Sequence, residues 1–274
     1  MGKRLILVAD GLGITEATTS AGFLAIQSGL ATSGRLHVVG AWAREVARHY
    51  HNEDLGVGLV LTSPHPVLGY RPLTYAPTLM GGAGTFPTTV EDLLEHAEAT
   101  EVYHELRAQL ERAILWGLTI SHITVFEDCV WPRADLADTV FALAEEFDVA
   151  LRIEPAYDEE HLGYDAYALA RQRGITTVDR TLPVEGDIIT SIAQLFDVLE
   201  GELRLKTASV TELSVTFGTN TSELHAYGTK TILVIDPVDL LSQASQLNQL
   251  LTALDYSLDG YRGIASSGTI DLMH

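Results

Sequence analysis

The chain has few of the residues that mark several large classes of protein. It has one cysteine, Cys129, so no disulfide forms within the chain and a disulfide-stapled secreted domain is excluded. No apolar run approaches the roughly 20 residues of a membrane-spanning helix. The apolar run at residues 5–9 is too short for a signal peptide and predicts a buried strand. From these absences we expect a cytoplasmic protein without a membrane partner.

Basic residues are also scarce. The 274 residues include 17 Lys and Arg against 37 Asp and Glu, which gives a formal net charge of −20. A surface of this sign repels nucleic-acid phosphates and anionic lipids, so we expect no nucleic-acid partner. The apolar content of 46% is that of a folded chain with a sizeable core, and it argues against disorder.

Short apolar segments alternate with longer helical segments along the whole chain. The expected strands are residues 5–9, 35–39, 55–61, 118–128, 150–153, 175–178 and 212–216. The expected helices run from 13 to about 28, over 41–51, 88–116, 136–147, 158–174 and 188–199, and from 236 onward, with Pro237 at the first helical position. Gly29 and Gly201 are the expected stops of the first and of the 188–199 helix, and Asp158 is the expected cap of the 158–174 helix. Because neither a linker nor a repeat interrupts this alternation, we predict a single α/β domain over residues 1–274, a TIM-barrel-like (β/α) barrel.

A long loop, residues 62–87, is rich in proline, glycine and tyrosine and has no clear period. Loops of this length in compact domains are more often functional lids than simple connections. Tyr70 and Arg71 in this loop are candidates for contact with a ligand, although tyrosines in such loops also serve in packing.

The segment 118–128 carries the most informative set of candidates. Side chains alternate along a strand, so His122 and Phe126 share one face with Thr124 between them. His122 lies early on the strand and therefore deep in a barrel, which also permits a structural role. Phe126 could fill the core or stack on a sugar ring. The strand ends in Glu127 and Asp128, at the rim where barrels place their active sites.

Further candidates follow other predicted strands. Asp10 ends the first strand and has two interpretations, a base or sugar-hydroxyl ligand, or a carboxylate that orders a loop. It could form an acid site together with Glu127 and Asp128, although carboxylates in loops are usually solvated. Arg152 and Glu154 follow the fifth strand and could pair across the mouth of the barrel.

An ordered set of segments resembles one known family. The matching segments are 8–13 (Val-Ala-Asp-Gly-Leu-Gly), 29–33 (Gly-Leu-Ala-Thr-Ser), 61–63, 69–73, 106–113, 121–126 and 211–213. Together they resemble the YdjC-like carbohydrate deacetylase family (the ChbG/HpnK deacetylases) over almost the full length. The resemblance implies a distorted, seven-stranded barrel and a divalent metal (Mg, Zn or Ni) held by aspartate and two histidines. It also implies hydrolysis of an N-acetyl group from a sugar, in which the metal activates a water and polarises the amide carbonyl.

The sequence departs from that family at its metal ligands. Of the paired aspartates only Asp10 remains, because Gly11 stands at the second position. The histidine of the third strand falls at Gly58, or at Val60 with a shifted alignment. The His-x-Asp-Ser-His motif keeps His122 but has Thr124 and Phe126 at its aspartate and second histidine, and the late histidine position is Thr216.

These departures leave three hypotheses open. The favoured one is a deacetylase homologue associated with N-acetylated oligosaccharides that has lost metal-dependent amide hydrolysis, with no cofactor expected. An active deacetylase with a rebuilt site is the alternative, and its cofactor would be a divalent metal. A non-catalytic sugar-binding or scaffold protein is the third. A small carbohydrate is the expected ligand, with Asp10 as the catalytic candidate, and a homodimer remains open.

Overall fold

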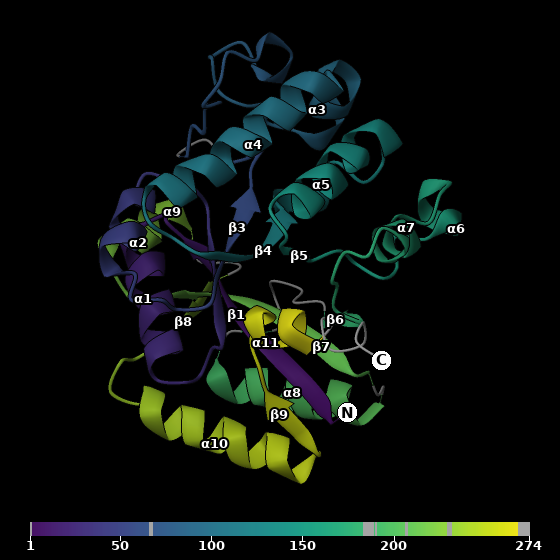
Figure 1. The fold of residues 1–274 in the computed structure, drawn as a ribbon. Coiled ribbons are helices and arrows are strands. Elements are labelled where there is room, and N and C mark those ends of the chain that lie inside the picture. Colours follow the sequence, from purple (N-terminus) through teal and green to yellow (C-terminus); the bar gives the residue numbers. More distant parts are fainter. Residues whose placement is uncertain are drawn as a thin grey trace. The chain divides into compact units, whose positions relative to one another are not determined.

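The computed structural model describes residues 2–65, 68–182, 189, 191–205, 208–228 and 232–267. The chain divides into two compact units, Met1–Leu36 with Val178–His274, and His37–Thr177 (Figure 1). In both units parallel strands are flanked by helices, which confirms the predicted α/β class. No helix in the described ranges combines the length and the apolar character that crossing a membrane requires.

The first unit contains the N-terminal strand and the C-terminal third of the chain. Its strands are β1 (Lys3–Leu12), β2 (Ser33–Leu36), β6 (Arg180–Leu182), β7 (Val210–Gly218), β8 (Ile232–Val234) and β9 (Tyr256–Leu258). Its helices are α1 (Glu16–Gln27), α8 (Ile192–Leu205), α9 (Ser222–Tyr227), α10 (Leu240–Ala253) and α11 (Tyr261–Ser267). The strands run in the order β2-β1-β7-β6, while β8 pairs with β7 and β9 pairs with β1.

The sheet of the first unit has one apolar and one polar face. In β1 and β7, Leu7 and Leu213 are register partners, and Leu5, Ala9, Val215 and Phe217 extend the same face. This face packs against α8 and α10, which lie side by side in Figure 1, and together they form a buried core. The opposite face carries the alternate residues of both strands, among them Asp10 and Glu212. The packing of the helices thus leaves the functional candidates of β1 and β7 on the other side of the sheet.

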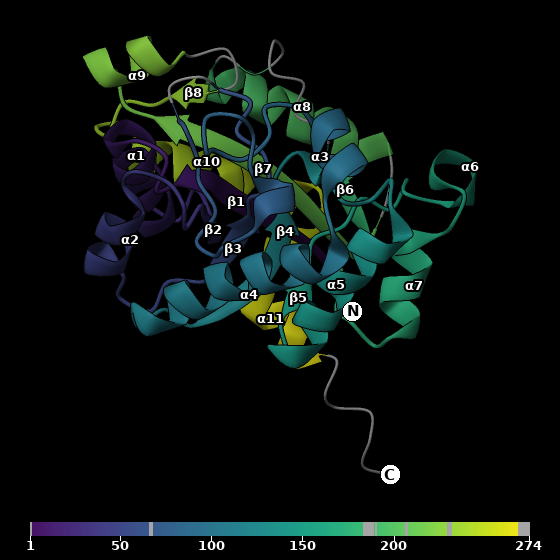
Figure 2. The same cartoon turned by 90° about the horizontal axis from the view of Figure 1, so that it is seen from above.

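The second unit is built on three parallel strands. They are β3 (Leu55–Leu59), β4 (Ile120–Val125) and β5 (Ala150–Leu151), in the order β3-β4-β5. The helices are α2 (Ala43–His49), α3 (Val90–His96), α4 (Ala99–Leu115), α5 (Ala134–Glu146), α6 (Glu159–Leu162) and α7 (Ala166–Gln172), with short 3-10 turns η1 (Pro77–Leu79) and η2 (Phe126–Asp128). The long helices α4 and α5 lie side by side in both views (Figures 1 and 2).

Several predicted helices are interrupted or shifted. The helix expected over 88–116 is two helices, because Ala97 is extended and Arg133 binds the backbone carbonyls of Leu94 and Ala97 that the break exposes. The helix expected over 158–174 begins at its predicted cap, Asp158, but is broken at Gly163, which is left-handed at φ 78°.

The other corrections concern where elements begin and end. Instead of the strand expected at 175–178, the structure has β6 at Arg180–Leu182. The helix α8 continues past Gly201 to Leu205, and the predicted start of that helix, Ile188, lies outside the described residues. The last long helix begins at Leu240 and not at Pro237, because Asp236 accepts a hydrogen bond from the Val238 amide and forms a turn there.

The long loop at 62–87 is held by one face of α4. Glu101, Glu105 and Gln109 are spaced by four residues, so they share a face of the helix. Gln109 binds the amide and the carbonyl of Val60, and the buried Glu105 accepts from the amides of Leu73 and Thr74. Glu101 accepts from the amide and the hydroxyl of Thr78. These polar side chains, of which Glu105 and Gln109 are buried, satisfy backbone groups of Val60 and of the long loop.

Gly56 on β3 gives a test of how tightly the second unit is packed. A Cβ atom at position 56 would lie 2.4 Å from the backbone carbonyl oxygen of His122 and equally close to its ring. We expect Gly56→Ala to lower the free energy of unfolding by about 1–3 kcal/mol, because the two strands must move apart. Urea denaturation would measure the change.

The matched control is Gly201→Ala in the exposed interior of α8, where no atom lies within 4 Å of the added Cβ. There the smaller loss of backbone entropy should stabilise the protein by about 0.5–1 kcal/mol. An unchanged stability of Gly56→Ala would contradict the close approach of β3 and β4.

Candidate functional site

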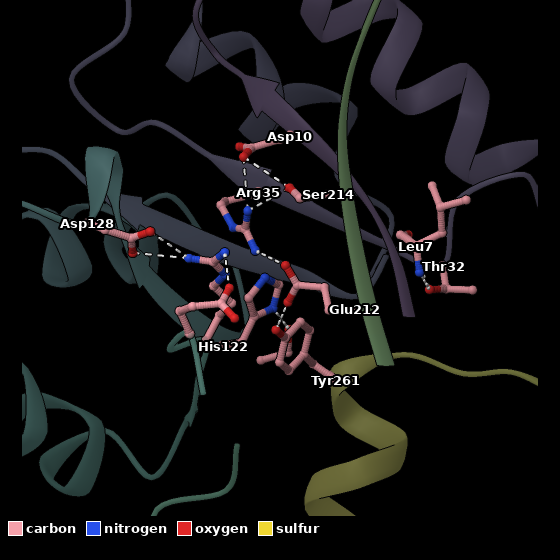
Figure 3. Close-up of polar contacts among 12 residues, drawn as sticks. Leu7, Asp10, Thr32, Arg35, His122, Asp128, Glu212, Ser214 and Tyr261 are labelled. Carbon is pink, nitrogen blue, oxygen red and sulfur yellow. Dashed lines mark hydrogen bonds and ion pairs between the residues drawn. The ribbon is translucent and has the colours of Figure 1, made fainter. Parts of the chain in front are cut away.

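A buried arginine lies at the centre of the polar face of the first unit. Arg35 of β2 donates to a carboxylate oxygen of Asp10 at 2.9 Å and to Glu212 at 3.1 Å (Figure 3). Ser214 accepts from Arg35 at 2.8 Å and donates to Asp10 at 3.2 Å. Tyr261 of α11 donates a hydrogen bond to the second oxygen of Glu212. The guanidinium therefore connects three neighbouring strands, β1, β2 and β7.

The register of the strands explains why these side chains meet. Asp10 pairs with Thr216 and Val8 pairs with both Ser214 and Ser33, so the alternate residues of the three strands share one face. Burial alone would lower the pKa of the Arg35 guanidinium, but the charges of Asp10 and Glu212 outweigh it and raise the pKa above its usual value. Arg35 is thus a permanent cation inside the unit, with two carboxylates as its counter-charges.

Asp10 is a partly exposed member of this cluster, with 26% of its side chain accessible. Its other oxygen accepts from the Gly11 amide at 2.7 Å. Tyr227 of α9 lies nearby: burial raises the pKa of its hydroxyl, and the negative charge of Asp10 adds to the shift. The structure therefore gives Asp10 a role in ordering the end of β1 while leaving part of the carboxylate open to a ligand.

Gly11 and Thr216 stand close together beside Asp10. Gly11 has φ 78°, a left-handed conformation that favours glycine, in a stretch where the pairing of β1 with β2 is irregular. A Cβ atom at position 11 would lie 3.0 Å from the Thr216 methyl group. Both positions correspond by resemblance to metal ligands, and both now lack a donor suited to a metal, since a threonine hydroxyl is a weak ligand.

The second unit brings together the remaining positions of the resemblance. Gly58 of β3 and Thr124 of β4 are register partners, so the third-strand histidine position and the aspartate position of the fourth strand adjoin each other. His122 is fully buried, its ring lies over Gly56, and its Nδ1 is 3.0 Å from the Ser121 hydroxyl.

The two carboxylates at the end of β4 have partners in the same unit. Glu127 accepts from the Thr62 hydroxyl at 2.6 Å. Arg152 donates to both oxygens of Asp128, at 2.9 and 3.0 Å (Figure 3), and also faces Glu154 at 3.6 Å, so the predicted pair of Arg152 and Glu154 is present. Glu127 and Asp128 both have positive φ, 57° and 52°, a conformation that is uncommon outside glycine and that costs some backbone strain.

Asp128 also accepts from the indole of the buried Trp131 at 3.1 Å. Burial raises the pKa of the neighbouring Tyr157 hydroxyl, and the charge of Asp128 raises it further. Asp128 is thus paired with Arg152 and Trp131, beside a Tyr157 hydroxyl that stays neutral.

The other candidates differ in exposure. Phe126 lies in η2 and contacts the ring of His37 edge-on, with ring centres 5.1 Å apart. Tyr70 is buried, with only 2% exposed, whereas Arg71 is exposed on the long loop. Cys129 is 1% exposed, and burial, followed by the charges of Glu127 and Asp128, raises the pKa of its thiol, so it is unsuited to act as a nucleophile.

Arg35, Glu212 and Tyr261 were not among the sequence candidates. A signal for Glu212 exists in the sequence, because polar residues at 212, 214 and 216 alternate with Leu213, Val215 and Phe217. Such alternation indicates a strand with one polar face. The sequence does not contain a comparable signal for Arg35, whose partners lie 25 and 177 residues away.

The donor set around Asp10 does not fit a divalent metal. A guanidinium has no lone pair to offer and stays charged, so Arg35 places a cation where a metal would be repelled. Among the described residues, no group of three or more His, Cys, Asp or Glu side chains is arranged to hold a metal ion.

Comparison with known proteins places the chain beside carbohydrate deacetylases. The family model of the YdjC-like proteins matches residues 4–232. A carbohydrate deacetylase of Thermus thermophilus is 43% identical over 148 residues, 53% of this chain and 52% of the relative. A carbohydrate deacetylase of Geobacillus stearothermophilus is 30% identical over 191 residues, 66% of this chain and 75% of the relative. The match thus spans about half the length of the Thermus relative.

A solved structure shares the fold. It comes from Enterococcus faecalis V583, and the protein is named for a suspected role in cellobiose-phosphate cleavage. The superposition has a TM-score of 0.76 and covers 96% of this chain and 99% of that protein, at 20% sequence identity. At this identity the similarity concerns the fold, and it supports the predicted α/β architecture.

Removal of the central cation should destabilise the protein. Arg35→Met leaves the carboxylates of Asp10 and Glu212, of which Glu212 is only 1% exposed, without their counter-charge. We expect a loss of about 3–5 kcal/mol in the free energy of unfolding, measured by urea denaturation.

The control is Arg48→Met, because Arg48 pairs with Glu45 at the surface and is 67% exposed. Its loss should be below about 1 kcal/mol. If both variants lost the same amount, Arg35 would not be the centre of the cluster. Adding Glu212→Gln to Arg35→Met should recover part of the loss, since one uncompensated charge is then removed.

Proposed function

The chain belongs to the family of YdjC-like proteins, and on this premise we propose that it is a carbohydrate-binding homologue of the carbohydrate deacetylases that has lost metal-dependent amide hydrolysis. Its ligand on this proposal is an oligosaccharide of N-acetylated sugars. The observation that carries the proposal is the ion pair between Arg35 and Asp10, with the nitrogen and oxygen 2.9 Å apart. The one aspartate that the family pattern retains already has a cationic partner.

The substitutions at the other ligand positions support the same conclusion. In the first unit Gly11 and Thr216 adjoin Asp10, and in the second unit Gly58 and Thr124 adjoin each other. The family framework is therefore preserved as a set of neighbouring positions, while the donors at those positions are replaced. Metal chemistry needs several carboxylate or imidazole donors around one ion. The replaced positions leave the chain poorly equipped to lower the pKa of a bound water.

The remaining groups are suited to sugar binding. A carboxylate and a hydroxyl that both retain some exposure, Asp10 and Ser214, are common partners of sugar hydroxyl groups. The charge of Arg35 fixes the orientation of both through its hydrogen bonds. A rigid polar cluster of this kind can position a neutral sugar without contributing a chemical step.

A second candidate function rests on the same pair of residues. In an active enzyme with a rebuilt site, Asp10 would act as the general base toward a water molecule, and Arg35 would hold that carboxylate ionised and oriented. The exposed part of Asp10, 26% of its side chain, favours this alternative. Only the rebuilt enzyme would turn over its substrate, whereas both functions require Asp10.

Acetate release separates the two functions. The purified chain would be incubated with N-acetylated chitooligosaccharides, with and without added Zn²⁺, Ni²⁺ or Mg²⁺, and acetate would be quantified together with bound metal. We expect saturable binding by calorimetry, no acetate above the blank, and no stoichiometric metal. Asp10→Asn should weaken binding, whereas Asp197→Asn, an exposed carboxylate of α8, should leave it unchanged.

Acetate release that depends on metal and disappears in Asp10→Asn would overturn the proposal. Release without metal that disappears in the same variant would support the rebuilt enzyme. The absence of both binding and release would favour a scaffold.

A further inference from the structure

A cavity of about 500 Å³ lies entirely within the second unit. Its walls come from the segment 38–44 at the start of α2, the segment 69–73 of the long loop, and the end of α4. Cavities of this size hold small-molecule ligands. None of its lining residues belongs to the cluster around Asp10.

Three arginines line this cavity, although the chain has few cations. Arg44 comes from α2, Arg71 from the loop and Arg112 from α4. No carboxylate lines the cavity together with them. The chain has a net charge of −20, yet all the charged residues among the described lining of this cavity are arginines.

These arginines also differ from the others in their partners. Among the described residues, nine arginines form ion pairs with carboxylates. Arg171 and Arg262 have other polar or electrostatic partners. Within the described residues, Arg44, Arg71 and Arg112 are the arginines whose side chains make neither a hydrogen bond nor an ion pair. Their charges are therefore available to a ligand.

The wall that carries Arg71 is held in place before any ligand binds. Glu105 accepts from the Leu73 amide, two residues after Arg71, at 2.9 Å. On the other side, the Tyr70 amide donates to the Ser63 hydroxyl at 3.0 Å and the Tyr70 carbonyl accepts from Phe86 at 2.8 Å. Glu105 and Arg112 are seven residues apart on α4, two helical turns on one face. One helix thus anchors the loop and supplies an arginine to the cavity.

We propose that this cavity is a binding site for the phosphate group of a small organic phosphate. Several guanidinium groups facing one space repel one another, and a bound dianion relieves that repulsion while accepting charge-assisted hydrogen bonds. The indole of Trp116, together with Pro72 and Leu73, provides an apolar side on which a sugar or another ring can stack. The site goes beyond the proposed function and does not depend on it.

Unpaired arginines that are merely solvated would be expected to scatter over the surface. Here all three line one cavity, together with an aromatic ring, and they come from three separate segments. If the arginines were only solvated, substituting any of them would not change the affinity for phosphate. A phosphate site predicts a loss at each arginine, which makes the two interpretations experimentally distinct.

Calorimetry with inorganic phosphate, glucose 6-phosphate and glucose tests the proposal. We expect saturable binding of both phosphates, weakened by added NaCl, and none of glucose. Each of Arg44→Gln, Arg71→Gln and Arg112→Gln should weaken binding about tenfold. The control is Arg48→Gln, which removes a neighbouring arginine of α2 that is paired with Glu45 and lies outside the cavity.

The variants also report on the fold and on the organic part of the ligand. Because the three arginines hold no carboxylate of the described chain, their removal should leave the Tm unchanged, in contrast to Arg35→Met. Trp116→Phe should reduce the preference for glucose 6-phosphate over inorganic phosphate. Asp10→Asn should bind phosphate like the unaltered protein, so failure of the sugar-binding proposal and failure of this one are distinguishable.

Two results would overturn the inference. One is the absence of saturable binding of either phosphate at millimolar concentration. The other is phosphate binding that persists when all three arginines are substituted, or glucose binding as tight as that of glucose 6-phosphate. In either case the protein would not be recognising the anion through these arginines. Equal affinity for inorganic phosphate and glucose 6-phosphate would support the phosphate site and would show that the organic part of the ligand adds nothing to binding.

Discussion

The burial of one guanidinium dictates much of the first unit. Arg35 is 4% exposed and its charge must be neutralised inside the protein, because an uncompensated buried ion costs several kcal/mol. Asp10 and Glu212 supply that compensation from strands on one side of β2, while Ser214 accepts a further hydrogen bond from Arg35 and Tyr261 donates one to Glu212. The polar face of the sheet is organised around this charge, and the position of Asp10 follows from it. The function of Asp10 therefore cannot be separated from its role as a counter-ion.

The distribution of cations gives the two units different chemical characters. In the first unit the arginine of the site is paired with two carboxylates, which leaves a cluster of formal charge −1 whose polar groups are suited to hydroxyl groups. In the second unit, Arg152 holds Asp128 and Glu154 in a comparable way, but the arginines of the cavity have no carboxylate partner among the described residues. The chain has 17 basic residues against 37 acidic ones, so arginines without a carboxylate partner among the described residues are unexpected. That contrast is the physical basis for proposing an anion as the ligand of the cavity and a neutral sugar as the ligand of the cluster around Asp10.

Local pattern predicted much of the fold and only part of the site. The strand at residues 5–9, the helix stop at Gly29 and the cap at Asp158 depend on neighbouring residues, and the structure confirms them. The break after His96 depends on Arg133, which lies in another element, and no local pattern contains it. Asp10 could be identified because it ends a strand. Arg35 could not, because its importance comes from carboxylates on two other strands.

The sequence by itself determined the alternation of strands and helices, the excess of acid, and the absence of metal-binding side chains at Gly11, Gly58 and Thr124, since each is a property of residue type and local order. The tertiary structure decided which side chains meet. Strand register places Arg35 between residues that lie 25 positions before it and 177 after it, and the anchoring of the long loop by Glu105 places Arg71 on the wall of a cavity. Register and loop anchoring depend on contacts between distant segments, and for that reason the partners of each charge became visible only in the folded chain.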